Sequence, residues 1–159
     1  MLRIIAFLAV ATLLSVASPA AESEFGSRDE AVAMVNRVQE MFKKEGAEAT
    51  FKAVSNKSTK EFHDRDLYPF IYDLSVPGQL ICVAHGARPM LIGKNLIDLK
   101  DQDGKYMGRE MIVLVHGVGY GWVDYKFPNP VTNKIEDKSA YVEKLGDKYF
   151  VGVGVYKEN

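Results

Sequence analysis

Cysteine is almost absent from the sequence, which has only Cys82 among its 159 residues. One cysteine cannot form a disulfide within the chain, so it is either half of an intermolecular bridge or a buried thiol. Cys82 lies within the apolar stretch LICVA. We therefore expect a buried, unreactive thiol.

An excess of charge of either sign is also absent. The chain has 20 lysine and arginine residues against 21 aspartate and glutamate residues, and its formal net charge is −1. Proteins that bind nucleic acid carry a basic surface, and anionic membrane surfaces attract basic segments. We therefore expect neither nucleic acid nor a membrane surface among the partners of this protein.

The common catalytic and metal-binding motifs are missing. The sequence contains neither G-x-S-x-G nor H-E-x-x-H. Its three histidines, His63, His85 and His116, are far apart and lack the spacing of metal ligands. The stretch DQDGK at 101–105 lacks the later ligands of a calcium loop and is typical of an Asp-Gly turn. We expect no catalytic residue, no metal and no cofactor.

Long apolar runs are confined to the N-terminus. There, Arg3 precedes an apolar run at 4–16, and a small-x-small site ends at Ala20. This pattern predicts a secretory signal peptide over 1–20 that is cleaved after Ala20 or one residue later. The run is shorter than the roughly 20 residues that a spanning helix needs, and an uncleaved anchor is the alternative. We expect an exported, periplasmic protein that is not inserted in the membrane after cleavage.

The rest of the chain is long enough for one domain. Residues 21–27 are expected to form a short tether, and 28–157 a single domain. At the start of this domain, Ser27 and Glu30 match the S-x-x-E capping box of a helix N-terminus.

Helical spacing of apolar residues continues after this capping box. Gly46 is suited to the end of a helix, because glycine adopts the conformation that such ends often need. We predict one helix over 28–45 and a second over 47–54.

The hydrophobic period changes from helical to alternating in the second half of the chain. Alternating apolar residues predict five strands, at 67–74, 79–85, 120–127, 138–145 and 148–156. A helix is expected over 106–117, and a short helical piece near Leu96 in the long connection at 86–106. Turn residues between neighbouring strands indicate hairpins, so we predict an α+β fold with an antiparallel sheet and helices covering one face.

A candidate pocket is indicated by the end of the second predicted strand, ICVAHGARPM. This strand is apolar until His85, and Arg88 follows after two small residues. Period-two alternation places His85 on the same face as Ile81 and Val83, an apolar face that we expect to be covered. Arg88 would suit a small carboxylate there, because a buried anion needs a charged partner.

Aromatic and polar side chains on the other predicted strands supply further walls of this pocket. The predicted ligand-binding residues are Tyr72, His85, Arg88, Trp122, Tyr125, Lys138 and Tyr141. Trp122 and Tyr125 would form the apolar wall, and Lys138 and Tyr141 would add hydrogen-bond donors. Plainer interpretations exist: the aromatic residues as core, Lys138 as a solvated rim residue, and His85 as an imidazole bonded to a backbone carbonyl.

Six short stretches carry a family resemblance: AHG, P-x-L-I-G-K-N-L, D-L-K-D-x-D-G-K, G-W-V-D-Y, P-N-P-x-T-x-K and K-S-x-Y-V. Together they resemble the single Cache domain, a sensing module of bacterial chemoreceptors and sensor kinases, over roughly 29–156. The family implies a PAS-like sheet of five antiparallel strands, a long N-terminal helix and a helical flap after the second strand. It also implies that small organic acids bind on the flap side.

Members of this family usually lie between two membrane helices, whereas this chain ends soon after its last predicted strand. We therefore expect a free-standing exported Cache domain that binds a small carboxylate as a sensory module without its own output domain. It would present its ligand to a membrane-bound sensor partner. Two alternatives are an envelope enzyme or enzyme accessory that uses His85 as acid or base, and a structural interaction domain.

Overall fold

The computed structural model describes residues 24–156. The predicted signal peptide at 1–20, its cleavage site and the last residue of the predicted domain at 28–157 lie outside the described residues. Within the described part, no helix is both long enough and apolar enough to cross a bilayer. The cleavage site and the exact domain limits stay predictions.

The first element is a long helix, α1 (Arg28–Ser55), which begins with the predicted capping box. The Ser27 hydroxyl accepts the N–H of Glu30 at 3.2 Å, and the Glu30 carboxylate accepts the N–H of Ser27 at 2.7 Å. Gly46 interrupts the helix with φ 82° and ψ 178°, a conformation that is essentially restricted to glycine. The two predicted helices are therefore confirmed as the two halves of one kinked helix.

Five strands form one antiparallel sheet, as predicted. They are β1 (Pro69–Asp73), β2 (Ile81–His85), β3 (Tyr120–Pro128), β4 (Ile135–Leu145) and β5 (Tyr149–Tyr156), in the spatial order β2-β1-β5-β4-β3. β5 pairs with both β1 and β4. The last strand of the chain therefore lies in the middle of the sheet.

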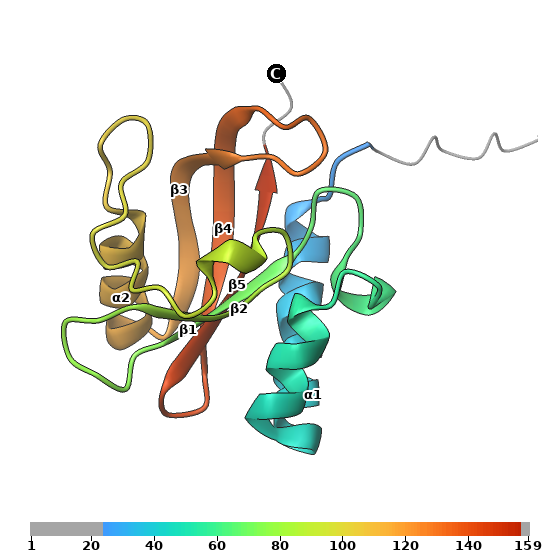
Figure 1. The fold of residues 1–159 in the computed structure, drawn as a ribbon, viewed down its shortest axis with the longest axis vertical. Helices are drawn as coiled ribbons and strands as arrows, with labels where there is room; N and C mark the ends of the chain where they lie inside the picture. The colour runs from blue at the N-terminus through green and yellow to red at the C-terminus, as the bar shows by residue number, and fades with distance from the viewer. Residues whose placement is uncertain (1–23, 157–159) are drawn as a thin grey trace, which may run out of the picture.

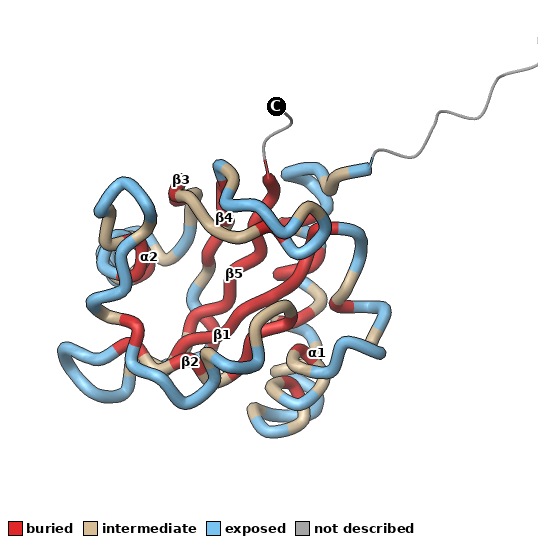
Figure 2. The backbone as a smooth tube through the Cα atoms, turned by 45° about the horizontal axis from the view of Figure 1, so that its top comes forward, coloured by how far each residue is buried: buried red, intermediate tan, exposed pale blue. Residues whose placement is uncertain are grey.

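Helices cover both faces of the sheet rather than one (Figure 1). α1 packs on one face, and α2 (Met107–Gly117) packs on the other together with the connection before it. The central strand β5 shows the reason, because Val151 and Val153 face α1 while Phe150 joins the core beside α2. The prediction of helices on one face is wrong, since both sides of this strand are apolar and need cover. Figure 2 shows the buried residues concentrated in these central strands.

The connection between β2 and α2 forms a flap, but its helical piece is not where the sequence placed it. A single 3₁₀ turn, η2, spans Pro89–Leu91 and has proline in its first turn. Leu96 is buried and not helical, and its N–H donates to the carbonyl of Leu80 at 2.8 Å. The prediction of a helix near Leu96 is wrong because the chain there pairs with the edge of the sheet through Asn95.

The DQDGK stretch forms the predicted turn and ties the flap to β3. The N–H of Gly104 donates to the Asp101 carbonyl at 3.0 Å. One carboxylate oxygen of Asp101 accepts the N–H of Lys105 at 2.9 Å, and the other accepts the N–H of Lys126 on β3 at 3.0 Å. This carboxylate therefore bonds to backbone groups of both the turn and the sheet.

A β-bulge in β2 decides which face its side chains occupy. Cys82 and Ala84 pair with successive residues of β1, so Val83 between them has no partner. One extra residue reverses the alternation beyond it. His85 therefore lies on the same face as Cys82, and the prediction that it shares a face with Ile81 and Val83 is wrong.

Cys82 is a free, fully buried thiol, as predicted. Simple alternation predicts Leu80, Cys82 and Ala84 on one face. Leu80 lies with Cys82 in the core beside α2, but Ala84 lies in the core beside α1. Burial raises the pKa of the Cys82 thiol to about 12. At neutral pH the group is a protonated, shielded thiol.

Candidate functional site

A small cavity lies between the sheet and the layer formed by the flap and α2. The space open to the centre of a water molecule is about 20 Å³, which is enough for one or two waters. Its wall combines apolar side chains with four polar ones, Tyr72, His85, Tyr125 and Lys138. The structure therefore brings four of the seven predicted ligand-binding residues together around one space.

Lys138 is the most unusual member of this wall, because its side chain is almost fully buried at 1% exposure. Its ammonium nitrogen lies among four aromatic rings, at 4.0 Å from the centre of Tyr68, 5.0 Å from Tyr156, 5.4 Å from Phe127 and 5.6 Å from Phe70. The negative faces of aromatic rings attract a cation. Aromatic contact therefore replaces part of the hydration that the ammonium loses.

This ammonium forms no ion pair with any residue that the structure describes. Its nitrogen donates to the Tyr68 hydroxyl at 2.7 Å. Burial lowers the pKa of Lys138 to about 7, the carboxylate of Asp66 opposes this shift, and the guanidinium of Arg88 adds to it. A buried cation without a paired anion is unfavourable. An anion in the cavity would therefore be stabilised by Lys138.

His85 presents a hydrogen-bond donor to the same cavity. Its Nδ1 accepts the N–H of Ala87 at 3.3 Å and that of Arg88 at 3.0 Å, so the ring proton is assigned to Nε2. Nε2 has no hydrogen-bond partner among the described residues. Burial, followed by the charges of Lys138 and Arg88, lowers the pKa of His85 to about 3. The imidazole is therefore neutral at physiological pH, and its Nε2–H is free to bind an acceptor in the cavity.

Two phenol groups add further donors. Tyr72 and Tyr125 line the cavity, and neither hydroxyl is hydrogen-bonded to another residue in the described part of the chain. Burial raises the pKa of both tyrosines well above the usual value. Both therefore remain protonated donors at neutral pH.

Arg88 lies next to the cavity but not on its wall. It lines a neighbouring surface groove that shares Leu99, Met107 and Phe127 with the cavity. Its guanidinium carbon lies 5.7 Å from the centre of the Phe127 ring. The prediction that Arg88 contacts the ligand directly is not supported by this position, although its positive charge acts on Lys138 and His85.

Trp122 and Tyr141 lie on the opposite face of the sheet, so their placement in the pocket was wrong. Both pack against the core beside α1, where Arg28 lies 3.9 Å from the centre of the Trp122 ring. The Tyr141 hydroxyl donates to the Glu143 carboxylate at 3.1 Å. Strand alternation explains the error, because residues three apart, such as Trp122 and Tyr125, point to opposite faces.

Sequence reasoning did not assign several enclosing residues to the pocket. Phe70 and Phe127 close it from the sheet, and Met107 and Met111 close it from α2. A signal for each was present: Phe127 has the same parity as Tyr125, and the two methionines are four residues apart on one helix face. Phe70 likewise has the parity of its neighbour Tyr72.

An antiparallel five-stranded sheet with a small enclosed pocket under a flap is the architecture of a PAS-like sensor domain. The chain belongs to the Cache domain family, since the family model described as a Cache domain matches residues 27–159. This match confirms the family resemblance of the sequence, and the observed sheet and helices confirm its predicted α+β fold.

One relative is the sensor histidine kinase MctS of Rhizobium johnstonii, which is 31% identical over 129 residues. The match covers 79% of this chain and 27% of the kinase, so the chain spans about a quarter of the length of that relative. The domain is thus similar to one part of a larger signalling protein.

Solved structures share the fold. A methyl-accepting chemotaxis protein from Vibrio parahaemolyticus superposes with a TM-score of 0.66 at 26% identity, covering 81% of this chain and 87% of that chain. A Cache chemosensory domain, described in terms of carboxylic acid recognition, superposes with a TM-score of 0.62 at 24% identity, covering 82% and 88%. The latter likeness shows the fold alone.

Proposed function

We propose that this protein binds a small organic acid in the cavity under its flap and acts as an extracytoplasmic sensory module. The observation that carries the proposal is the buried ammonium of Lys138, which reaches the cavity without an ion pair among the described residues. A carboxylate supplies the missing charge and accepts hydrogen bonds.

The other donors suit the two oxygens of such a ligand. The Nε2–H of His85 and the hydroxyls of Tyr72 and Tyr125 line the same space as Lys138, and the surrounding side chains are apolar. A site with a few fixed donors and apolar walls favours a compact anion. With about 20 Å³ open to the centre of a water molecule, the cavity favours short acids over long ones. The recognition of carboxylic acids named for one structural relative agrees with this chemistry.

Binding is better supported than catalysis by His85. A general base works best when its pKa is close to the operating pH, whereas the pKa of His85 is lowered to about 3. Backbone N–H groups occupy its Nδ1. The ring is therefore suited to donate one hydrogen bond rather than to transfer protons near neutral pH.

We further propose that the occupied domain is read by a membrane-bound sensor partner. The named relatives, a sensor histidine kinase and a methyl-accepting chemotaxis protein, support a signalling context. The predicted signal peptide at 1–20 supports a location outside the cytoplasm. Signal cleavage is tested by N-terminal sequencing of the exported protein.

Calorimetric titration of acetate, propionate, lactate and pyruvate tests the binding site. We expect wild type to bind at least one acid. Lys138→Met or His85→Ala should weaken binding by about 10- to 150-fold, the loss expected when one hydrogen bond to a charged group is removed. Arg88→Ala should have a smaller effect, and Tyr141→Phe on the opposite face should have none. Equal affinities of wild type and Lys138→Met, or no binding of any acid by wild type, would contradict the proposal.

A further inference from the structure

A chain of hydrogen bonds leads from the pocket to the end of the last strand. The Lys138 ammonium donates to the Tyr68 hydroxyl oxygen at 2.7 Å, and the Tyr68 and Tyr156 hydroxyls lie 2.9 Å apart. The Tyr156 hydroxyl donates to the carbonyl of Pro128 at 2.8 Å. Because that carbonyl can only accept, the proton between the two tyrosines comes from Tyr68. The direction of the chain is therefore fixed from Lys138 towards Tyr156, the last residue of β5.

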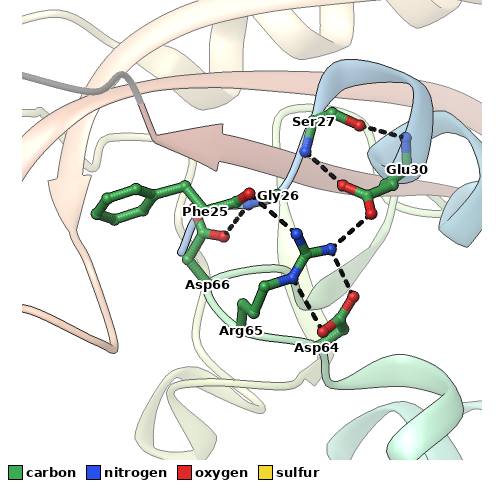
Figure 3. Close-up of polar contacts among 7 residues, drawn as sticks. All are labelled: Phe25, Gly26, Ser27, Glu30, Asp64, Arg65 and Asp66. Atoms are coloured by element: carbon green, nitrogen blue, oxygen red, sulfur yellow. Dashed lines mark hydrogen bonds and ion pairs between the residues drawn. The ribbon is translucent and has the colours of Figure 1, made fainter. Parts of the chain in front are cut away.

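A second connection joins Tyr156 to the start of the domain. Asp66 is fully buried, and its carboxylate accepts the N–H of Gly26 at 2.6 Å through one oxygen and the N–H of Tyr156 at 3.3 Å through the other. Figure 3 shows Asp66 reaching the backbone of Gly26 just before α1. One carboxylate therefore holds together the two ends of the described domain.

Neighbouring ion pairs fix the same corner. The Arg65 guanidinium bonds to the Glu30 carboxylate at the start of α1 and to the Asp64 carboxylate, both at 2.7 Å, and to the carbonyl of Phe25 at 3.0 Å (Figure 3). The two carboxylates are about half exposed and the guanidinium is partly exposed, and ion pairs at the surface contribute little. Within this corner, the buried Asp66 is the carboxylate whose pKa is affected by the charge of the buried Lys138.

Asp66 and Lys138 act on each other electrostatically. Burial raises the pKa of Asp66, while the N–H groups of Gly26 and Tyr156 and the charge of Lys138 act to lower it. The ammonium therefore favours the ionised carboxylate, which is the stronger hydrogen-bond acceptor. A ligand anion beside Lys138 would oppose this effect and would also draw the ammonium away from Tyr68.

We propose that Asp66 and Tyr156 report occupancy of the Lys138 pocket to the two ends of the domain, which are held less firmly when an anion is bound. This inference rests on the proposed function, since it assumes that the pocket receives an anion. The expected change is a weakening of the hydrogen bonds that the N–H groups of Gly26 and Tyr156 donate to the Asp66 carboxylate. Gly26 lies just before α1, and Tyr156 is the last residue of β5.

Hydrogen exchange of the Gly26 and Tyr156 amides in the purified full chain tests this coupling without any ligand. Lys138→Met removes the charge and the donor but keeps the length of the side chain. We expect exchange at both amides to rise by about 5- to 150-fold, the usual range of coupling between sites, relative to the core amide of Ile71. Met107→Ala is the matched control, because it alters the same cavity without touching the polar chain.

A second variant distinguishes the loss of the Lys138 charge from a general failure of the protein to fold. Lys138→Gln keeps a hydrogen-bond donor but carries no charge. We expect it to speed hydrogen exchange at the same two amides. Exchange that rises equally at Gly26, Tyr156 and Ile71 in both lysine variants, or as much in Met107→Ala, would overturn the inference.

Titration with the four acids separates this inference from the proposed function. If an acid binds by calorimetry and the Gly26 and Tyr156 amides exchange faster relative to Ile71, both are supported. If an acid binds and exchange at the two amides changes only as much as exchange at Ile71, the inference is wrong while the binding function stands. If no acid binds but Lys138→Met speeds exchange at the two amides, the binding function fails, while the coupling of Lys138 to these amides stands.

Discussion

Single residues determine the electrostatics of this pocket, and Lys138 is the main one. Lysine is almost never fully buried without a partner, yet here its ammonium has aromatic rings and a tyrosine hydroxyl around it. Rings and hydroxyls stabilise the cation but carry no opposite charge. Burial therefore lowers the pKa of Lys138 to about 7, so its side chain is partly neutral at physiological pH.

Binding of a carboxylate is expected to take up protons above pH 7. Burial lowers the pKa of Lys138 to about 7, and a bound anion favours the charged form and so raises this pKa. We expect full affinity below about pH 7 and a fall of up to about tenfold per pH unit above it. Calorimetry near neutral and alkaline pH, in buffers of different ionisation enthalpy, measures both the affinity and the proton uptake.

Without ligand, the same residue gives the opposite dependence for stability. The unfolded chain keeps the ordinary lysine pKa of 10.5, whereas the folded value is about 7. The unfolded state therefore binds more protons between these values, and the free energy of unfolding rises with pH in that window.

The binding prediction has its own contradicting outcome. A carboxylate affinity that does not change with pH, or that changes equally in wild type and Lys138→Met, would show that Lys138 does not govern binding.

At the scale of elements, β5 makes room for the pocket. It carries glycine at two positions where a side chain would collide with a neighbour. A Cβ on Gly152 would lie 2.3 Å from the Phe70 ring, and one on Gly154 would lie 2.1 Å from Cε of Lys138. Both contacts are far shorter than atoms tolerate. Glycine in this central strand therefore allows the close approach of larger side chains from β1 and β4.

Gly154→Ala is expected to displace Lys138 and weaken carboxylate binding by about tenfold or more. Overpacking of this kind also destabilises a protein by about 1–3 kcal/mol. Urea unfolding and the acid titrations measure the two effects. Gly117→Ala at the end of α2 is the matched control, because a Cβ there meets nothing within 4 Å. Similar affinity in wild type and Gly154→Ala would show that the position of Lys138 is unimportant.

For the whole molecule, the sheet separates two apolar cores. One lies beside α1 and the other beside α2 and the flap, so the pocket belongs to only one of them. The α1 side contains the capping box and the kink, and the flap side contains the hydrogen-bond donors of the proposed ligand site. We therefore expect that the flap side can open for ligand exchange without disruption of the other core.

Cys82 offers a measure of such opening, because it is fully buried in the flap-side core. Burial also raises the pKa of its thiol to about 12, and the thiolate is the reactive form. We expect a thiol reagent to label the folded protein far more slowly than the urea-unfolded protein. An acid at 100 times its Kd should slow labelling by up to about 100-fold further. Rapid labelling of the folded protein would contradict this.

The sequence by itself determined the helices α1 and α2, the five strands and the family. Ser27 and Glu30 placed the start of α1, Gly46 placed its interruption, and alternating residues placed the five strands, because capping, glycine conformations and strand periodicity act within a few residues. Cys82 was recognised as buried from its apolar neighbours alone. The Lys138 and His85 side chains were chosen for their chemistry, and their role in binding stays a prediction.

Only the tertiary structure decided which side chains meet. Tyr68 and Lys138 are 70 positions apart in the sequence, and their contact depends on β5 lying between β1 and β4 with Gly154 beside the lysine. The bulge at Val83 turned His85 to the pocket face against the simple alternation. Such contacts depend on strand pairing and register between distant segments, which local sequence does not encode.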